Sequence, residues 1–361
     1  MLEASLKAAL TGGFALDVDL TAANGITILF GASGSGKTTV LRAIAGLVPS
    51  LQGFVRVDQT VLFDSSNGTD VPVHLRRIGY VGQSLALFPH LTVTENIAYG
   101  VQHIDREVRA ARVTQMLRAF RIEHLRDRRP AQASGGEQQR IALARSLVTQ
   151  PRALLLDEPL SALDHATQSH IMDDLRRWNR DHEIPILYVT HSHREAFELG
   201  RQMIVIAGGR VEARGVPHDV LDAPARLAVA NIAGFENVFP SRVRAIDASQ
   251  GTMTCVIGDS TDVEVPYTGA VAGARLHVAV RAGDVLVAAE LPTSLSAQNL
   301  LEGTVLTLDR RGPTVIARLS VGVDLQVLLT PAACERLHLQ PGCRVWAVIK
   351  TYSWRVLIET T

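Results

Sequence analysis

Long hydrophobic runs and a surplus of charge of either sign are both missing from this sequence. No stretch reaches the roughly 18 apolar residues that a membrane-spanning helix needs. The N-terminal segment does not have the basic and apolar parts of a secretory signal. The only three cysteines, Cys255, Cys334 and Cys343, do not have the spacing of a metal site. We therefore expect reduced thiols in a cytosolic protein that reaches a membrane only through a partner.

The charge balance does not indicate nucleic acid binding. Lysine plus arginine and aspartate plus glutamate number 36 each, which gives a formal net charge of zero and no overall basic field. The chain has 361 residues, of which 47% are hydrophobic, and this is typical of a globular protein too long for a single core. We expect two or three domains.

The first 235 residues alternate short apolar runs with amphipathic segments. This alternation predicts an α/β domain with a largely parallel sheet, because parallel strands need helical crossovers. Buried strands are expected at residues 25–30, 152–157 and 184–190, a hairpin at 203–213, and helices at 106–120 and 138–148.

After about Phe235 the segments become short, rich in valine and separated by turn residues, which predicts a small all-β region. A weak internal repeat relates residues 237–243 to 299–305, and residues 277–281 to 346–350. We therefore expect two related β units, at 236–292 and 293–361, with chance similarity among valine-rich strands as the alternative.

A phosphate-binding loop is predicted where the sequence GASGSGKT fits G-x-x-x-x-G-K-[ST], between an expected strand and a helix over residues 38–47. Glycines let backbone N–H groups turn toward phosphate oxygens, Lys37 supplies charge near the β and γ phosphates, and the Thr38 hydroxyl can coordinate Mg²⁺. The expected nucleotide contacts are Gly31, Ala32, Ser33, Gly34, Ser35, Gly36, Lys37, Thr38 and Thr39.

Two carboxylates, Asp157 and Glu158, follow an apolar strand directly. In a parallel sheet that end faces the ligand crevice. Asp157 can hold Mg²⁺ through water, and Glu158 can polarise an attacking water. Solvated turn residues or helix caps are the alternative for this pair taken alone.

The string SGGEQQR at residues 134–140 is the most specific in the chain. Ser134 and Glu137 have the spacing of a capping box, and Gly135 and Gly136 leave N–H groups for an anion at the helix start. On its own, the string also fits an ordinary capped helix.

Taken in order, these motifs resemble those of ABC transporter ATPases over roughly residues 1–235. The string SGGEQQR resembles the ABC signature, with Ala133 where leucine is usual, and Gly82 stands where an apolar residue is common in the Q-loop. The resemblance implies catalytic roles for Glu158, His191 and Gln83, and a metal site at Thr38, Gln83 and Asp157. It also implies nucleotide contacts from Ser134, Gly135, Gly136 and the D-loop residue Asp164.

The resemblance further implies a head-to-tail homodimer with ATP and Mg²⁺ at its interface, where the phosphate loop of one copy faces the signature of the other. It implies two copies of a membrane permease, an indirect partner in a periplasmic or surface binding protein, and a position on the inner face of a bacterial membrane. Phe14 is the nearest aromatic residue that could stack on adenine, and it fits a core position of the first strand equally well.

Residues 293–358 resemble the molybdate-binding β module, a small OB-like barrel, with Gln298 where arginine is common. This resemblance implies an oxyanion effector bound by Ser296, Asn299, Lys350 and Thr351, with a purely structural barrel as the alternative. The segment Asn24-Gly25-Ile26-Thr27 also resembles molybdate importers. Molybdate or tungstate is the expected solute. Sulfate, ferric iron, polyamine or sugar import stays open, and an ABC ATPase acting on nucleic acid is a more distant alternative.

Overall fold

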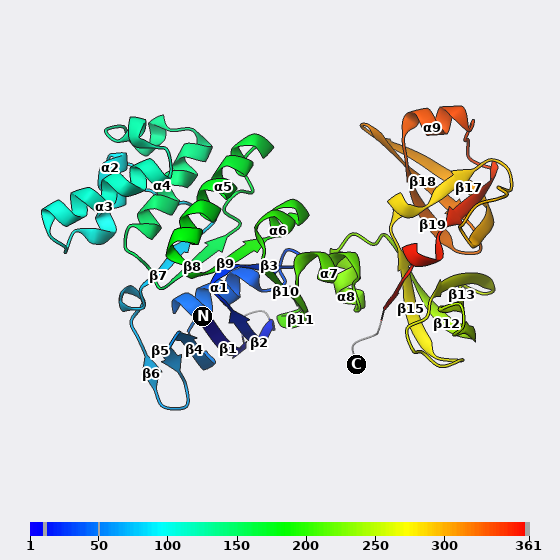
Figure 1. Cartoon of the computed structure of the whole chain (residues 1–361), viewed down its shortest axis with the longest axis horizontal. Coiled ribbons are helices and arrows are strands. Elements are labelled where there is room, and N and C mark those ends of the chain that lie inside the picture. The colour runs from blue at the N-terminus through cyan, green and yellow to red at the C-terminus, as the bar shows by residue number, and fades with distance from the viewer. Residues whose placement is uncertain (10–12, 50, 358–361) are drawn as a thin grey trace. The chain divides into compact units, whose positions relative to one another are not determined.

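The computed structural model describes residues 1–9, 13–49 and 51–357 and divides into two compact units, Met1–His218 and Asp219–Thr361 (Figure 1). The boundary between the two units lies before Phe235, after which the sequence changes to short, valine-rich segments. Its physical reason is that Arg281 and Arg355 hydrogen-bond to the carbonyls of Leu221 and Asp222, which ties helix α7 (Pro217–Asp222) to the β-rich part of the chain.

Unit 1 is built on an eleven-stranded sheet with the order β6-β5-β4-β1-β2-β11-β10-β3-β9-β8-β7. Neighbouring strands from β10 to β7 are parallel, and β3, β8 and β9 are buried along their whole length, as expected for a sheet covered on both faces. This confirms the predicted α/β class. The strands are β1 (Leu2–Ala9), β2 (Ala15–Ala22), β3 (Gly25–Phe30), β4 (Gln52–Val57), β5 (Thr60–Asp64), β6 (Thr69–Asp70), β7 (Ile78–Val81), β8 (Ala153–Asp157), β9 (Pro185–Thr190), β10 (Gln202–Ala207) and β11 (Arg210–Gly215).

Helices of unit 1 begin at residues that suit helix starts. Thr92, Asp105, Ser134, Asp164 and Ser192 each accept a backbone N–H at the first turn of the helix that follows. Among the described residues, no helix is both long and apolar enough to cross a bilayer. The helices are α1 (Lys37–Ala45), α2 (Val93–Ala98), α3 (Arg106–Ala119), α4 (Gly135–Leu147), α5 (His165–His182) and α6 (His193–Leu199).

Unit 2 includes helix α8 (Leu227–Ile232), which precedes two five-stranded sheets that share one topology. Their orders are β14-β13-β12-β15-β21 and β19-β18-β17-β20-β16. The strands are β12 (Asn237–Asp247), β13 (Thr252–Ile257), β14 (Thr261–Pro266), β15 (Arg275–Val280), β16 (Leu286–Ala288), β17 (Asn299–Arg311), β18 (Thr314–Ser320), β19 (Asp324–Leu329), β20 (Arg344–Ile349) and β21 (Arg355–Leu357), with a short helix α9 (Pro331–Arg336).

The weak repeat in the sequence corresponds to this duplicated topology. Asn237 pairs with Val280 in the first sheet as Asn299 pairs with Ile349 in the second, and both long strands carry a bulge six residues after the asparagine, at Val243 and Val305. The halves also exchange their last strands, because β16 pairs with β20 and β21 pairs with β15. Neither half therefore completes its sheet alone.

The two asparagines that begin β12 and β17 join the halves by matched hydrogen bonds. Asn237 accepts from the Gln326 N–H at 2.7 Å and donates to the Gln326 carbonyl at 2.9 Å. Asn299 does the same with Glu264, at 2.6 and 2.9 Å. Both amides are buried, with 2% and 3% of their surface exposed, and each satisfies the edge strand of the other half.

Replacing Asn237 or Asn299 with alanine is expected to loosen the opposite half. Each change leaves a backbone N–H and carbonyl without their partners, which costs about 1–3 kcal/mol for a buried group. Hydrogen exchange of the full chain should show faster exchange in β19 for Asn237→Ala and in β14 for Asn299→Ala. The exposed neighbouring amide provides the control, Gln298→Ala. Unchanged protection of β14 and β19 would contradict this role.

Candidate functional site

The phosphate loop leaves β3 and enters α1, as predicted. Glycine is required at Gly31, because a Cβ there would lie 2.3 Å from the Ile206 carbonyl oxygen and 2.7 Å from Ser35 Oγ. Gly34 and Gly36 have left-handed backbones, with φ of 78° and 106°. No side chain caps the start of α1, so its first N–H groups face the loop and can bind an anion.

Lys37 lies inside this loop. Its Nζ donates to the carbonyls of Gly31 at 2.9 Å and Ala32 at 2.8 Å, and the residue is only 5% exposed. Burial lowers the pKa of the Lys37 ammonium, while the charges of Glu158 and Asp157 raise it. The ammonium is thus fixed beside the loop by oxygen atoms and two carboxylates.

Asp157, at the end of β8, lies against two hydroxyl groups. Its Oδ1 accepts from Thr38 Oγ1 at 3.0 Å and its Oδ2 from the Tyr80 hydroxyl at 3.4 Å. Burial raises the pKa of the Asp157 carboxyl, and burial together with Asp157 raises the pKa of Tyr80 to about 12. The Tyr80 ring also lies close to the unusual Gly82, where a Cβ would be 3.2 Å from that ring.

The hydroxyl oxygen of Thr38 and the carboxylate of Asp157 lie together, and both are oxygen ligands of the kind that Mg²⁺ prefers. Within the described ranges, no three His, Cys, Asp or Glu side chains gather in a way that could hold a metal on their own. The donor set therefore fits an ion that takes its remaining ligands from phosphate and water, as Mg²⁺ commonly does, and does not fit a cage made only of protein groups.

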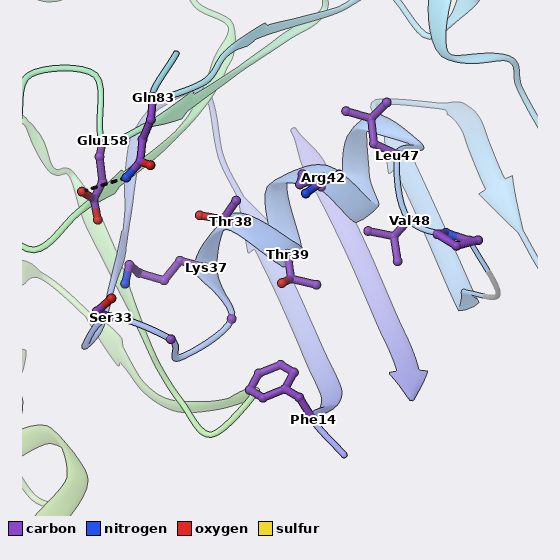
Figure 2. Close-up of a pocket in the computed structure, with 13 residues that line it drawn as sticks. Phe14, Ser33, Lys37, Thr38, Thr39, Arg42, Leu47, Val48, Gln83 and Glu158 are labelled. Carbon is purple, nitrogen blue, oxygen red and sulfur yellow. Dashed lines mark hydrogen bonds between the residues drawn. The ribbon is translucent and has the colours of Figure 1, made fainter. Parts of the chain in front are cut away.

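The Glu158 carboxylate lies between two side chains from other segments, Gln83 after β7 and His191 after β9. Its Oε2 accepts from Gln83 Nε2 at 3.3 Å (Figure 2), and its Oε1 lies 3.3 Å from His191 Nδ1. Glu158 has a φ of 46°, and its N–H is bonded to the Val189 carbonyl at 3.1 Å. This left-handed backbone is costly for a non-glycine residue and aims the carboxylate between Gln83 and His191. The three predicted catalytic residues are therefore brought together.

A cavity of about 600 Å³ opens beside these groups (Figure 2). Phe14 lies at one side of it, close enough that a Cβ on Gly36 would be 2.9 Å from its ring. Sequence reasoning missed Arg42, one helical turn after Thr38, although α1 periodicity could have found it. The lining is formed by Phe14, Ser33, Gly34, Gly36, Lys37, Thr38, Thr39, Arg42, Leu47, Val48, Pro49, Gln83 and Glu158.

The predicted signature residues do not line this cavity among the residues that the structure describes. Ser134 and Glu137 form the predicted capping box at the start of α4, where Ser134 and Gly135 are exposed. Gly136 is buried against α5, and a Cβ on it would lie 2.4 Å from Thr167 Cγ2. Asp164 caps α5 by accepting from the N–H groups of Ala166 and Thr167. Ser134, Gly135 and Asp164 are exposed and can be contacted from outside the chain's own cavity, whereas Gly136 is buried.

The other end of α4 contacts the segment that follows Gln83. Arg145 donates to the carbonyls of Ala86 at 2.7 Å and Leu85 at 2.8 Å, and its guanidinium lies 5.3 Å from the centre of the Phe88 ring. Nothing in the sequence indicated this link, because the partners are carbonyl groups about 60 residues away.

The candidate oxyanion residues of unit 2 have other partners in the structure. The Asn299 amide binds the Glu264 backbone and the Ile349 carbonyl, and Thr351 donates to the Glu264 carboxylate at 2.8 Å. Ser296 and Lys350 are exposed. Two of the four expected donors are thus used internally beside a carboxylate, and an anion site at these residues stays a prediction.

Comparisons with known proteins match both units. Residues 16–161 match the ABC transporter family and residues 295–355 the TOBE domain. The dimeric cassette MJ0796 from a bacterial ABC transporter has a TM-score of 0.52 and 29% identity, covering 60% of this chain and all but 1% of that one. The cbiO1 protein of Clostridium perfringens, part of the ABC transporter complex cbiONQ, has a TM-score of 0.55 and 28% identity over 61% of this chain and 89% of its own.

Two curated relatives extend the match over nearly the whole chain. The molybdenum import ATP-binding protein ModC of Rhizobium etli is 38% identical over 94% of this chain and 96% of its own length. ModC of Albidiferax ferrireducens is 40% identical over 93% and 92%. With the phosphate loop, its carboxylates and the duplicated β unit all in place, the chain belongs to the family of molybdenum import ATP-binding proteins, which are ABC transporter ATPases.

Proposed function

We propose that this chain binds and hydrolyses ATP to drive the import of molybdate through a membrane permease. Lys37, Thr38 and Glu158 line one cavity, and Asp157 is hydrogen-bonded to Thr38; this arrangement carries the ATPase part of the proposal. The solute is inferred from the curated relatives, which are named for molybdenum import and aligned with both units of the chain.

The phosphates of ATP are proposed to bind the N–H groups at the start of α1, with the Lys37 ammonium beside the β and γ phosphates. Thr38, Asp157 and Gln83 would hold Mg²⁺, which supplies charge neutralisation of the phosphates when bound. The 3.0 Å hydrogen bond between Thr38 and Asp157 supports this assignment, because it holds both oxygen groups at one place. Phe14 is proposed to stack on adenine, with support from its position in the cavity wall.

Glu158 is proposed to accept a proton from the attacking water and His191 to contact the γ-phosphate. Their 3.3 Å separation lets His191 orient the Glu158 carboxylate while Gln83 contacts its other oxygen. Because His191 is 64% exposed on its side chain, it remains accessible to a phosphate that enters the cavity.

Two copies are proposed to form a head-to-tail dimer in which the Ser134 end of α4 closes the partner's cavity. The support is that α4 begins with exposed groups, Ser134 and Gly135, that do not line the chain's own cavity. A helix N-terminus is suited to the negative charge of a γ-phosphate. Each dimer would act on two copies of a permease at the inner face of the membrane. A separate binding protein would deliver the solute to that permease.

Changing Glu158 to glutamine is expected to abolish turnover while ATP still binds. The amide cannot accept the proton of the attacking water, so steady-state hydrolysis should fall by at least about 100-fold. Equilibrium binding of a fluorescent ATP analogue should be unchanged. Glu183→Gln, at an exposed carboxylate after α5, provides the control. Near-normal hydrolysis by Glu158→Gln would refute the role of Glu158.

Mixing two inactive variants tests the shared site. In Lys37→Ala every phosphate loop is defective, and in Ser134→Arg every signature is blocked, so each homodimer should be inactive. An equal mixture should recover about a quarter of wild-type sites, because half the dimers are mixed and each of those has one intact site. Single-turnover hydrolysis measures the recovery. No recovery in dimers shown to exchange subunits would exclude a site shared between copies.

The imported solute can be tested separately from ATP hydrolysis. With its permease and binding protein in lipid vesicles, the chain is expected to hydrolyse ATP faster with molybdate or tungstate than with sulfate at the same concentration. Stimulation by sulfate but not molybdate would reassign the solute and leave the ATPase role intact.

A further inference from the structure

Two arginines face each other across neighbouring strands of unit 2. Arg242 in β12 is the direct cross-strand partner of Arg275 in β15, so both side chains leave the same face of the sheet, and both are exposed. Like charges directly opposite each other in an antiparallel pair destabilise the sheet. A nearby negative charge would offset that cost.

No carboxylate of the described chain supplies that charge. Arg242 donates through Nε to the carbonyl of Gly273 at 3.3 Å, which leaves its terminal nitrogens available. The Arg275 side chain makes no hydrogen bond or ion pair within the part of the chain that the structure describes. A third arginine, Arg244, lies beside them and is paired with Asp262.

These arginines line a surface hollow of about 860 Å³. The bulge in β12 after Val243 changes the course of the strand at Arg244. Val256 and Leu276 contribute apolar lining between the charged groups. The hollow therefore brings three guanidinium groups around a space large enough for a small anion.

The second half of unit 2 provides an internal control, because its register is the same. The positions of Arg242 and Arg244 are taken by Thr304 and Leu306. Arg344 corresponds to Arg275, lies opposite Thr304, and forms an ion pair with Glu302. The second half thus adopts the same topology without a facing arginine pair. The unpaired charge of Arg242 and Arg275 in the first half is therefore not required for folding.

We propose that Arg242, Arg275 and Arg244 bind a tetrahedral oxyanion dianion in this hollow. Guanidinium groups bind such anions with two parallel hydrogen bonds each, and the anion would remove the repulsion between the facing arginines. Cellular phosphate and imported molybdate share this chemistry. The site lies outside the matched TOBE residues 295–355 and uses none of the donors Ser296, Asn299, Lys350 and Thr351. It does not depend on the proposed ATPase function.

Anion binding to the full chain can be measured by titration calorimetry with phosphate and, separately, with molybdate. A non-hydrolysable ATP analogue with Mg²⁺ should be present at saturation so that the nucleotide cavity is filled. Wild-type protein should bind one anion per chain. The double variant Arg242→Ala/Arg275→Ala should bind no anion or bind it at least about tenfold more weakly. Arg344→Ala, the corresponding arginine of the second half, should retain it. Tighter binding of phosphate would indicate a cellular effector, and tighter binding of molybdate a response to the imported solute.

A variant with increased anion affinity distinguishes a lost binding site from a misfolded protein. Asp262→Asn removes the carboxylate that occupies Arg244 and should tighten anion binding several-fold, an effect that an unfolded protein cannot show. The proposal is overturned if wild-type protein binds neither anion under these conditions, or if the double arginine variant binds as wild type does.

Discussion

A buried ammonium group, that of Lys37, lies inside the loop between β3 and α1, and the surrounding site depends on how its charge is balanced. Lys37 loses most of its hydration, and loop carbonyls together with the charges of Asp157 and Glu158 offset that loss. The carboxylates come from the end of β8, which lies beside β9 in the same parallel sheet as β3. Parallel strands bring their carboxyl ends to one edge, so the sheet places charges far apart in sequence around one loop.

Sequence reasoning predicted this arrangement where the constraint is local. Gly34 and Gly36 adopt left-handed backbones that glycine allows, so the motif alone predicted the turn of the loop, whereas the close approach of Ile206 to Gly31 comes from β10, far along the chain. It missed Arg42, which the periodicity of α1 could have indicated, and it missed the hydroxyl contact of Tyr80 with Asp157, which depends on how β7 packs beside β8. The duplicated topology of unit 2 could be foreseen from the repeat, but the strand exchange could not, because β16 and β21 have three residues each and no distinctive pattern.

Asn299 illustrates a different limit of sequence reasoning. Its position in a string resembling a ligand-binding module predicted a donor to an anion, yet its amide binds the edge strand of the other half, as the corresponding Asn237 does. A residue repeated at both halves of a duplicated fold is explained first by a structural role common to both. Residues that differ between the halves, such as Arg242 and Thr304, carry more information about a specific function.

Helix α4 connects the proposed nucleotide contact at the subunit interface with the segment on which a permease would act. Its first turn carries Ser134, which is proposed to meet the partner's nucleotide, and its last turn carries Arg145, which holds the carbonyls of Leu85 and Ala86. Gln83, just before those carbonyls, contacts the Glu158 carboxylate. A shift of α4 on dimer closure would therefore move the segment after Gln83, and a permease contact with that segment would act back on Glu158. Because thermodynamic coupling is reciprocal, the same three contacts would let nucleotide binding drive the proposed permease and let that permease control the carboxylate proposed to act in hydrolysis.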